Sequence, residues 1–438
     1  MWKKISLIAF SCFLLHSCYT GSRLNNQNLA HLYQQEDVIL RPQISIYHSS
    51  DSISNLFYQI ASNELLYMRS DSNNYIAKAQ ITAILYKNYE ELIPLDSVST
   101  PIYHSKTTDE GELLGGVLEM KVPKGERYIV EVLVADINRN LQFRYVENID
   151  KRSEKSRQNF ALIDQEGFLK FPGNLCSSSE VLRLQHRFGD NVNMHVRYYN
   201  RDFPIAMPPY SMVNETPFNF KPDSSFSYLA GSPIVLNKRG FYHFQIDSNS
   251  YFGYSIFAFA DGYPELVKVE QLVQPLRYLT TNREYEELTT SNNPKKSVDA
   301  FWLKIGGSEE RARVLLRTYY ERVQDANKYF TSYLPGWKTD RGMIYCVFGP
   351  PNIIFRSSGG ERWIYGQESS SLSYTFQFAR VDNPFTENDY SLSRSTIYRY
   401  TWAQAVDTWR QGRVYNVNMI RRDQEQEMRS ADPSWYWN

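Results

Sequence analysis

The fold is decided by one stretch, Tyr333-Leu-Pro-Gly-Trp-Lys-Thr-Asp-Arg-Gly-Met-Ile-Tyr-Cys-Val-Phe-Gly-Pro-Pro-Asn352. Pro335 and Gly336 end a preceding helix, because proline cannot continue the backbone ladder and glycine tolerates a left-handed turn. The Asp-Arg-Gly triplet that follows predicts a second tight turn. Residues 343–348 are then an apolar run that predicts a short strand, and a Gly-Pro-Pro breaker closes it.

The helix before this stretch begins at Ser308, whose hydroxyl caps the first turn, and two glutamates follow in that positive turn. Its apolar residues recur with the spacing i, i+3, i+4, i+7, which predicts a wide face packed on a sheet. They are Ala312, Leu315, Leu316, Tyr319, Val323, Ala326, Phe330 and Tyr333. After the stretch, strands near 353–355, 361–365 and 372–379 predict an antiparallel meander, with a short helix at 401–409.

The quoted stretch resembles the signature of the GWxTD-domain family, which is found in envelope lipoproteins of Bacteroidota-type bacteria. The signature and its flanking features are carried by Gly336, Trp337, Thr339, Asp340, Arg341, Gly342, Gly349, Pro351 and Trp363-Ile-Tyr365. The resemblance covers residues 285–400. Asn352 stands where the family often has Asp, so no essential carboxylate is expected there. The resemblance implies a domain rather than a known chemistry.

The N-terminus predicts a lipid anchor. Two lysines precede a short apolar segment, which is too short to span a membrane as a stable helix. It runs into Leu15-His16-Ser17-Cys18, which resembles a bacterial lipobox. We therefore expect a signal peptide at residues 1–17, cleavage before Cys18, acylation of its thiol, and a lipidated tether at 18–40. Two or more acyl chains are enough for stable membrane attachment.

The residues after Cys18 bear on the membrane face. Tyr19 follows instead of the Asp that would resemble an inner-membrane retention signal, and residues 22–34 carry no acidic patch like that of surface-exposed lipoproteins. These features favour the periplasmic face of the outer membrane.

Between the tether and the signature, short alternating strands separated by turn residues predict two antiparallel β-sandwich modules of Ig-like class, at residues 41–150 and 158–270. The signature domain is expected at 285–438. The predicted fold is therefore mainly β, with an α+β C-terminal domain built from a helix and an antiparallel meander.

Composition and motifs exclude several kinds of site. Lys plus Arg equals Asp plus Glu at 48 each, so no global field favours nucleic acid. None of the seven histidines falls in the signature domain, which removes a Ser-His-Asp triad and the usual zinc ligand from it. Phosphate-binding and paired-cysteine motifs are also missing, so no cofactor and no metal is expected. Cys176 and Cys346 are interpreted as buried thiols.

Two functional hypotheses remain open. In the first, the signature is fold architecture, and the chain is a non-enzymatic scaffold that binds proteins of an outer-membrane assembly or secretion machine. A looser similarity of the meander to BamE/SmpA-type lipoproteins favours this hypothesis. In the second, Asp340 and Glu361 serve a glycan- or peptidoglycan-binding, or less readily cleaving, site, which requires an exposed aromatic cluster around them. Ser52 and Ser97 also resemble acceptors for O-glycosylation.

Overall fold

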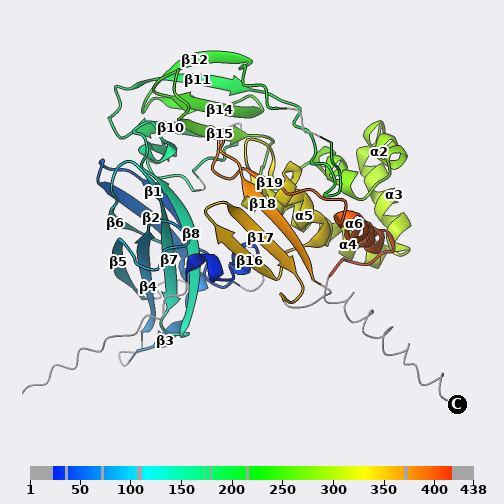
Figure 1. Ribbon diagram of the computed structural model, residues 1–438, viewed down its shortest axis with the longest axis horizontal. Coiled ribbons are helices and arrows are strands. Elements are labelled where there is room, and N and C mark those ends of the chain that lie inside the picture. Colours follow the sequence, from blue (N-terminus) through cyan, green and yellow to red (C-terminus); the bar gives the residue numbers. More distant parts are fainter. Residues whose placement is uncertain are drawn as a thin grey trace, which may run out of the picture.

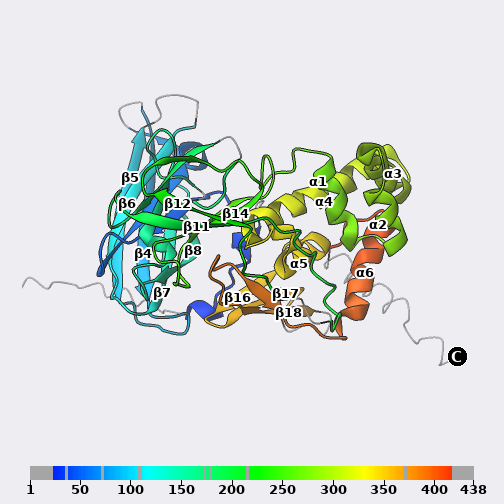
Figure 2. The same ribbon diagram turned by 90° about the horizontal axis from the view of Figure 1, so that it is seen from above.

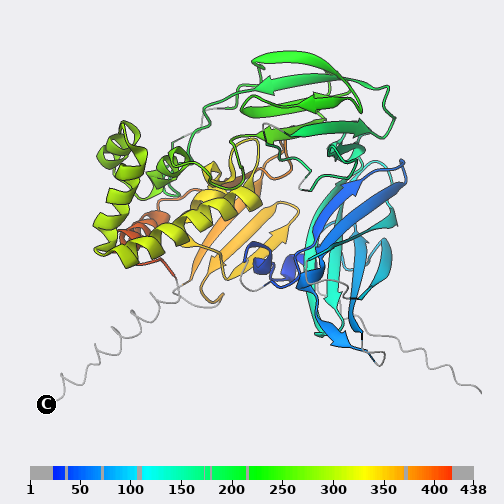
Figure 3. The ribbon, with the colours of Figure 1, turned by 180° about the vertical axis from the view of Figure 1, so that it is seen from behind.

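The computed structural model describes residues 23–34, 38–70, 74–105, 111–171, 173–177, 180–213, 217–368 and 373–416. These residues form three modules around a common centre, as Figures 1 and 3 show from opposite sides. The predicted fold class, mainly β with an α+β C-terminal part, is confirmed. The predicted signal peptide and Cys18 lie outside the described residues.

The first module is a two-sheet sandwich. One sheet has the order β1-β2-β6, and the other has the order β3-β4-β7-β8 with β5 added beside β4. Residues along β2 alternate between buried and half-buried, so one face of the strand lines the core beside Ile81 and Val132. The strands are β1 (Gln43–Tyr47), β2 (Ile53–Ala61), β3 (Tyr67–Arg69), β4 (Tyr75–Tyr86), β5 (Asp96–Ser105), β6 (Leu113–Lys121), β7 (Arg127–Asp136) and β8 (Leu141–Asp150).

The second module repeats this architecture with the sheets β13-β10-β9 and β12-β11-β14-β15. A long connection, described at residues 200–213 and 217–223, leaves β11 and reaches the third module before β12 begins (Figure 2). The strands are β9 (Phe160–Ile163), β10 (Val181–His186), β11 (Asn193–Tyr199), β12 (Ser224–Leu229), β13 (Pro233–Val235), β14 (Gly240–Gln245) and β15 (Tyr254–Ala258).

The third module packs helices against the predicted antiparallel meander, whose order is β16-β17-β18-β19. Its long helix is capped by Ser308, as predicted, with the Ser308 hydroxyl accepting from the backbone N–H of Arg311. The helices are α1 (Glu270–Val273), α2 (Asn282–Thr289), α3 (Pro294–Gly306), α4 (Glu309–Phe330), α5 (Asp340–Phe348) and α6 (Tyr398–Arg410). The strands are β16 (Ile353–Ser357), β17 (Gly360–Tyr365), β18 (Tyr374–Arg380) and β19 (Tyr390–Leu392).

The strand predicted for residues 343–348 is wrong, because these residues belong to helix α5. Thr339 caps this helix, since its Oγ1 accepts from the backbone N–H of Gly342 at 3.0 Å. All nine residues of α5 are buried. A helix that is apolar on every side shows no 3.6-residue period, so its sequence cannot be told from that of a buried strand.

Residues 23–34 of the predicted tether are folded onto the body. We call residues 23–34 the N-terminal clasp; it contains two short 3-10 turns, η1 (Leu24–Asn26) and η2 (Ala30–Tyr33). Leu24, Leu29 and Tyr33 are buried in a core shared with the outer face of the first sandwich and with the third module. The clasp thus fills the space between these two modules, which are far apart in sequence.

Candidate functional site

The signature begins where three backbone segments touch. A Cβ added to Gly342 would lie 1.9 Å from the carbonyl oxygen of Gly336, and one added to Gly336 would lie 2.0 Å from that of Ala326. Contacts this short leave no room for a side chain. The 3-10 turn η6 (Gly336–Lys338), helix α5 and helix α4 therefore pack backbone against backbone, and glycine is required at both positions.

Trp337 fills the junction beside these glycines and is only 6% exposed. Its backbone N–H donates to Oδ1 of Asn327 at 3.2 Å, and its carbonyl accepts from the hydroxyl of Tyr278 at 2.8 Å. Thr339, next to it, donates through Oγ1 to the carbonyl of Gly336 at 2.7 Å. These side chains connect α4 to the turn that precedes α5, so they position backbone rather than face solvent.

Asp340 joins the start of α5 to the strand at the far edge of the meander. Its Oδ2 accepts from the backbone N–H of Leu392 at 2.7 Å and from Nη1 of Arg394 at 3.0 Å. Nη2 of Arg394 lies 2.5 Å from Oδ1 of Asp340. Asp340 thus binds a backbone N–H of β19, while Thr339 caps α5.

A second buried charge cluster surrounds Glu361 of β17. Its Oε1 is 3.2 Å from Nη1 of Arg341 and 2.8 Å from Nε of Arg356, and it also accepts from the hydroxyl of Tyr33 at 3.1 Å. Its Oε2 accepts from the indole N–H of Trp363 at 2.8 Å. Burial alone would raise the pKa of Glu361, but the two arginines outweigh it and hold the pKa below its usual value.

The two carboxylates on which a glycan site would depend are thus both inside the protein. Asp340 is 5% exposed and Glu361 is 3% exposed, and each is paired with arginine. Trp337, the aromatic residue that such a site would present, is buried as well. The geometry therefore gives no support to a carbohydrate surface built on these residues.

The turn after α5 belongs to the same network. Gly349 ends the helix with φ of 82° and accepts from the hydroxyl of Tyr365 at 2.7 Å. The carbonyl of Pro351 accepts from Nε2 of Gln34 in the clasp at 2.9 Å. Oδ1 of Asn352 accepts from the backbone N–H of Gly366 at 2.8 Å. An amide oxygen is sufficient for that bond, which explains why no carboxylate is needed at position 352.

The part of the chain that carries the signature matches a known protein family. The family model of the GWxTD domain matches residues 240–411. The chain contains a GWxTD domain. No curated protein matches the chain. The matched region begins inside the second sandwich, at β14, and so takes in β14 and β15 together with the helices and the meander that we predicted from residue 285.

The inclusion of those strands has a structural basis in the contacts between the second sandwich and the loops and turns of the GWxTD domain that pack against it. Phe241 and Phe257 of the sandwich are fully buried in a cluster that also holds Leu334 and Phe385. The rings of Phe241 and Phe385 lie 4.8 Å apart. Nζ of Lys338, inside the signature, donates to the carbonyl of Phe203 at 2.8 Å. The domain is therefore built partly on the sheet that precedes it.

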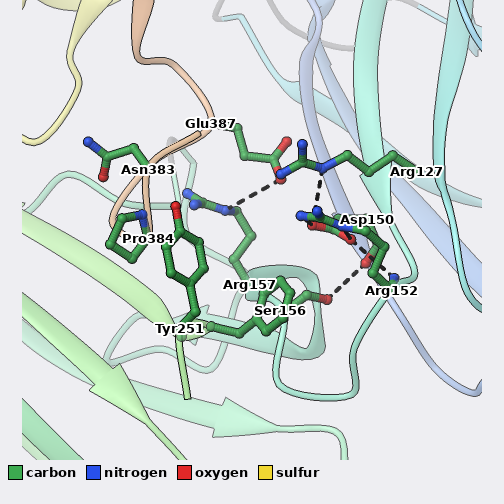
Figure 4. A pocket seen from close by; sticks show the side chains of 11 residues that line it. Arg127, Asp150, Arg152, Ser156, Arg157, Tyr251, Asn383, Pro384 and Glu387 are labelled. Carbon is green, nitrogen blue, oxygen red and sulfur yellow. Dashed lines mark hydrogen bonds and ion pairs between the residues drawn. The ribbon is translucent and has the colours of Figure 1, made fainter. Parts of the chain in front are cut away.

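A pocket lies where the three modules meet (Figure 4). Asp150 accepts from Arg152 at 2.9 and 2.7 Å and lies 3.5 Å from Nε of Arg127, while Nε of Arg157 lies 3.9 Å from Glu387. Burial alone would raise the pKa of Asp150, but its hydrogen bonds from Arg152 keep the pKa below its usual value. Since each guanidinium already faces a carboxylate, we interpret the residues around the pocket as ion pairs that hold the modules together.

The remaining predicted positions lie at different places. Ser52 is exposed in the turn before β2, whereas Ser97 is exposed within β5. Cys176 and Cys346 are free and buried, as predicted, and burial raises the pKa of both thiols. Among the described residues, no three His, Cys, Asp or Glu side chains gather as a metal ion would require. None of the described helices combines the length and apolarity needed to cross a bilayer.

Three residues of the two charge clusters were missed in the sequence: Tyr33, Arg356 and Arg394. Tyr33 lies 328 positions from Glu361, and Arg394 lies 54 positions from Asp340. No motif or period joins residues at these two separations, so no signal in one sequence could have assigned Tyr33 or Arg394. Arg356 differs, because it lies directly opposite Glu361 in the β16–β17 hairpin, and the register of the predicted meander could have found it.

Proposed function

We propose that the protein is a non-enzymatic lipoprotein, held at the periplasmic face of the outer membrane by a lipid on Cys18, and that it acts as a scaffold or interaction component of an envelope assembly or secretion machine. The main support for this proposal is that the side chains of the signature make their contacts inside the protein. The carboxylate of Asp340 is occupied by Arg394 and a backbone N–H, and Trp337 is buried. The lipobox-like N-terminus and the GWxTD domain support the envelope location.

If the signature is internal, a partner must bind an outer surface. We define the apolar ridge as five exposed side chains on two neighbouring segments. They are Met207, Met212, Val213, Ile397 and Tyr400, and each is at least 41% exposed. Large exposed apolar side chains that gather on one face are typical of protein interaction sites.

The two segments of the ridge are in direct contact. The backbone N–H of Ser395 donates to the carbonyl of Pro209 at 3.1 Å, and the guanidinium of Arg399 lies 5.3 Å from the ring centre of Tyr210. Arg394, the partner of Asp340, also reaches the carbonyl of Met207 at 3.5 Å. The signature therefore supports the ridge from beneath. Methionine side chains adapt easily to a partner surface, which suits this assignment.

The proposal is tested by crosslinking in cells. A photoreactive amino acid is placed at Ile397 or Met212 in the full-length chain, and the matched control is Val314, which is 59% exposed on α4 away from the ridge. We expect both ridge positions to crosslink the same outer-membrane or secretion protein, and position 314 to give none of it. Equal recovery from all three positions, or from none, contradicts a docking role for the ridge.

The anchor is tested separately. Cys18→Ser should abolish incorporation of radioactive palmitate and release the protein from the membrane fraction, because Cys18 carries the only lipid that we propose. Retention of label in the Cys18→Ser protein would show that the lipid is not on this residue. Cys176 and Cys346 serve as internal controls, since both are buried in the folded chain.

A further inference from the structure

The loop between β4 and β5 carries apolar side chains that the fold does not use. Leu92, Ile93 and Leu95 are 45%, 77% and 52% exposed. Ile93 is the most exposed large hydrophobic side chain in the part of the chain that the structure describes. The loop is nevertheless held at its end, since the backbone N–H of Leu95 donates to the carbonyl of Leu85 at 2.7 Å. These side chains are thus presented outward from an ordered hairpin.

The same loop holds the beginning of the N-terminal clasp. The backbone N–H of Asn25 donates to the carbonyl of Tyr89 at 3.1 Å. Tyr89 and Leu24 are buried in one hydrophobic core. The point at which the clasp leads back toward Cys18 therefore lies next to the loop that exposes Ile93.

The chain between Cys18 and the start of the clasp at Arg23 is short. Five peptide units separate Cys18 from Arg23, and a fully extended chain covers at most about 3.6 Å per residue, or about 18 Å. The clasp itself is fixed further along, because the N–H of Leu29 donates to the carbonyl of Ile354 at 2.8 Å and Gln34 bonds Pro351. A lipid on Cys18 would thus hold this edge of the body close to the bilayer.

We propose that Leu92, Ile93 and Leu95 contact the lipid bilayer beside the anchored Cys18, as a second, weaker point of membrane attachment. This inference rests on the proposed lipidation. Apolar side chains on a short loop enter the boundary between headgroups and acyl chains, where their burial is favourable. Glu90 and Glu91 precede them, so attraction to anionic lipid is not part of the contact. Glu90 is already used, since it accepts from the hydroxyl of Ser358 at 2.8 Å.

The contact can be tested without relying on lipidation in cells. Residues 1–18 are replaced by a hexahistidine sequence, and the protein is bound to phosphatidylcholine vesicles that contain a nickel-chelating lipid. Ile93→Cys is labelled with an environment-sensitive fluorophore, which is selective because Cys176 and Cys346 are buried. Vesicles that also contain a nitroxide-labelled lipid should quench this fluorophore at least about twofold if it enters the interface.

The matched control is Tyr103→Cys with the same label. Tyr103 is 70% exposed but lies eight residues further along β5 than Leu95, or about 26 Å at the rise of a strand. We expect no quenching there. A second protein carries about 20 Gly and Ser residues between positions 22 and 23, which lets the body leave the surface; its quenching at position 93 should disappear.

Two results would overturn the inference: equal quenching at positions 93 and 103, or no quenching at either. Quenching at position 93 in the protein with the inserted linker would also overturn the inference, because the clasp would then not set the distance between the loop and the bilayer. These results are independent of the Cys18→Ser experiment. If Cys18→Ser loses palmitate labelling and the fluorophore at position 93 is quenched, both proposals are supported. If the unmodified chain carries palmitate but the fluorophore at position 93 is not quenched, only the bilayer contact of the loop is rejected.

Discussion

Removal of a single hydroxyl group tests how the N-terminal clasp is attached to the rest of the protein. Tyr33→Phe removes one hydroxyl and leaves the ring in place among Tyr329, Phe330 and Trp363, whose ring centres lie 5.3, 4.8 and 5.6 Å from that of Tyr33. No cavity is created. The change is therefore confined to hydrogen bonding in the cluster around Glu361.

The expected magnitude follows from the partners of that hydroxyl. It donates to Glu361, and it accepts from Nη1 of Arg341 at 3.3 Å and from Nη2 of Arg356 at 2.5 Å. Its removal takes an acceptor from two buried guanidinium groups, which costs about 1–3 kcal/mol. At about 1.4 kcal/mol per tenfold change, the clasp should open roughly 5- to 150-fold more often.

Native-state hydrogen exchange measures this opening directly. The amides of Asn25 and Leu29 donate to Tyr89 and Ile354, so both exchange only when the clasp releases. In Tyr33→Phe, peptides that cover residues 24–33 should exchange faster by the factor above, while peptides from the first sandwich should not change. Tyr103→Phe removes an exposed hydroxyl and is the control. Exchange of Leu29 at the wild-type rate in Tyr33→Phe would refute the reasoning.

Three further predictions concern the interior. Gly342→Ala should prevent stable folding, because its Cβ would lie 1.9 Å from a backbone oxygen, whereas Gly359→Ala, with nothing nearer than 3.9 Å, should express and unfold like wild type. Asp340→Asn should lower the free energy of unfolding by about 3–5 kcal/mol, because it removes the buried negative charge that pairs with Arg394. A double-mutant cycle with Arg394→Met should show non-additivity above about 1 kcal/mol, and additive losses would contradict the pairing. Burial lowers the pKa of His243 to about 3. Since the unfolded imidazole takes its proton near pH 6.5, the contribution of His243 to stability should fall by about 1.4 kcal/mol per pH unit as pH drops from 6.5 toward 3. Burial also lowers the pKa of His48 and His186, to about 4, so His243→Gln should reduce the slope of urea-unfolding midpoints against pH without removing it, and an unchanged slope would contradict this.

The sequence predicted those parts of the fold whose causes are local. The cap at Ser308 and the regular spacing of apolar residues were sufficient for α4, and turn residues between alternating strands were sufficient for the sandwiches and the meander. The same reasoning failed at α5, because a helix buried on all sides has no polar face to reveal its period.

The candidate site was predictable in its residues but not in its contacts. The signature residues could be singled out, but the tight turn predicted at residues 340–342 is the first turn of α5. Nothing local could indicate Arg394, because that partner is fixed by the path of the chain through β19. The clasp was harder still, since a polar Asn- and Gln-rich segment gives no hydrophobic period. Its few buried side chains, including Tyr33, acquire their environment only from modules that the chain makes later.

That separation in sequence orders the assembly of the protein. Leu29 bonds a residue 325 positions downstream and Tyr33 bonds one 328 positions downstream, so the clasp lacks these hydrogen-bond partners until the last module has been synthesised and has folded. Contacts across such long loops form late, because their closure entropy must be met before they stabilise anything. The sandwiches can mature while the N-terminal segment is still undocked. The clasp therefore docks only after the third module has folded.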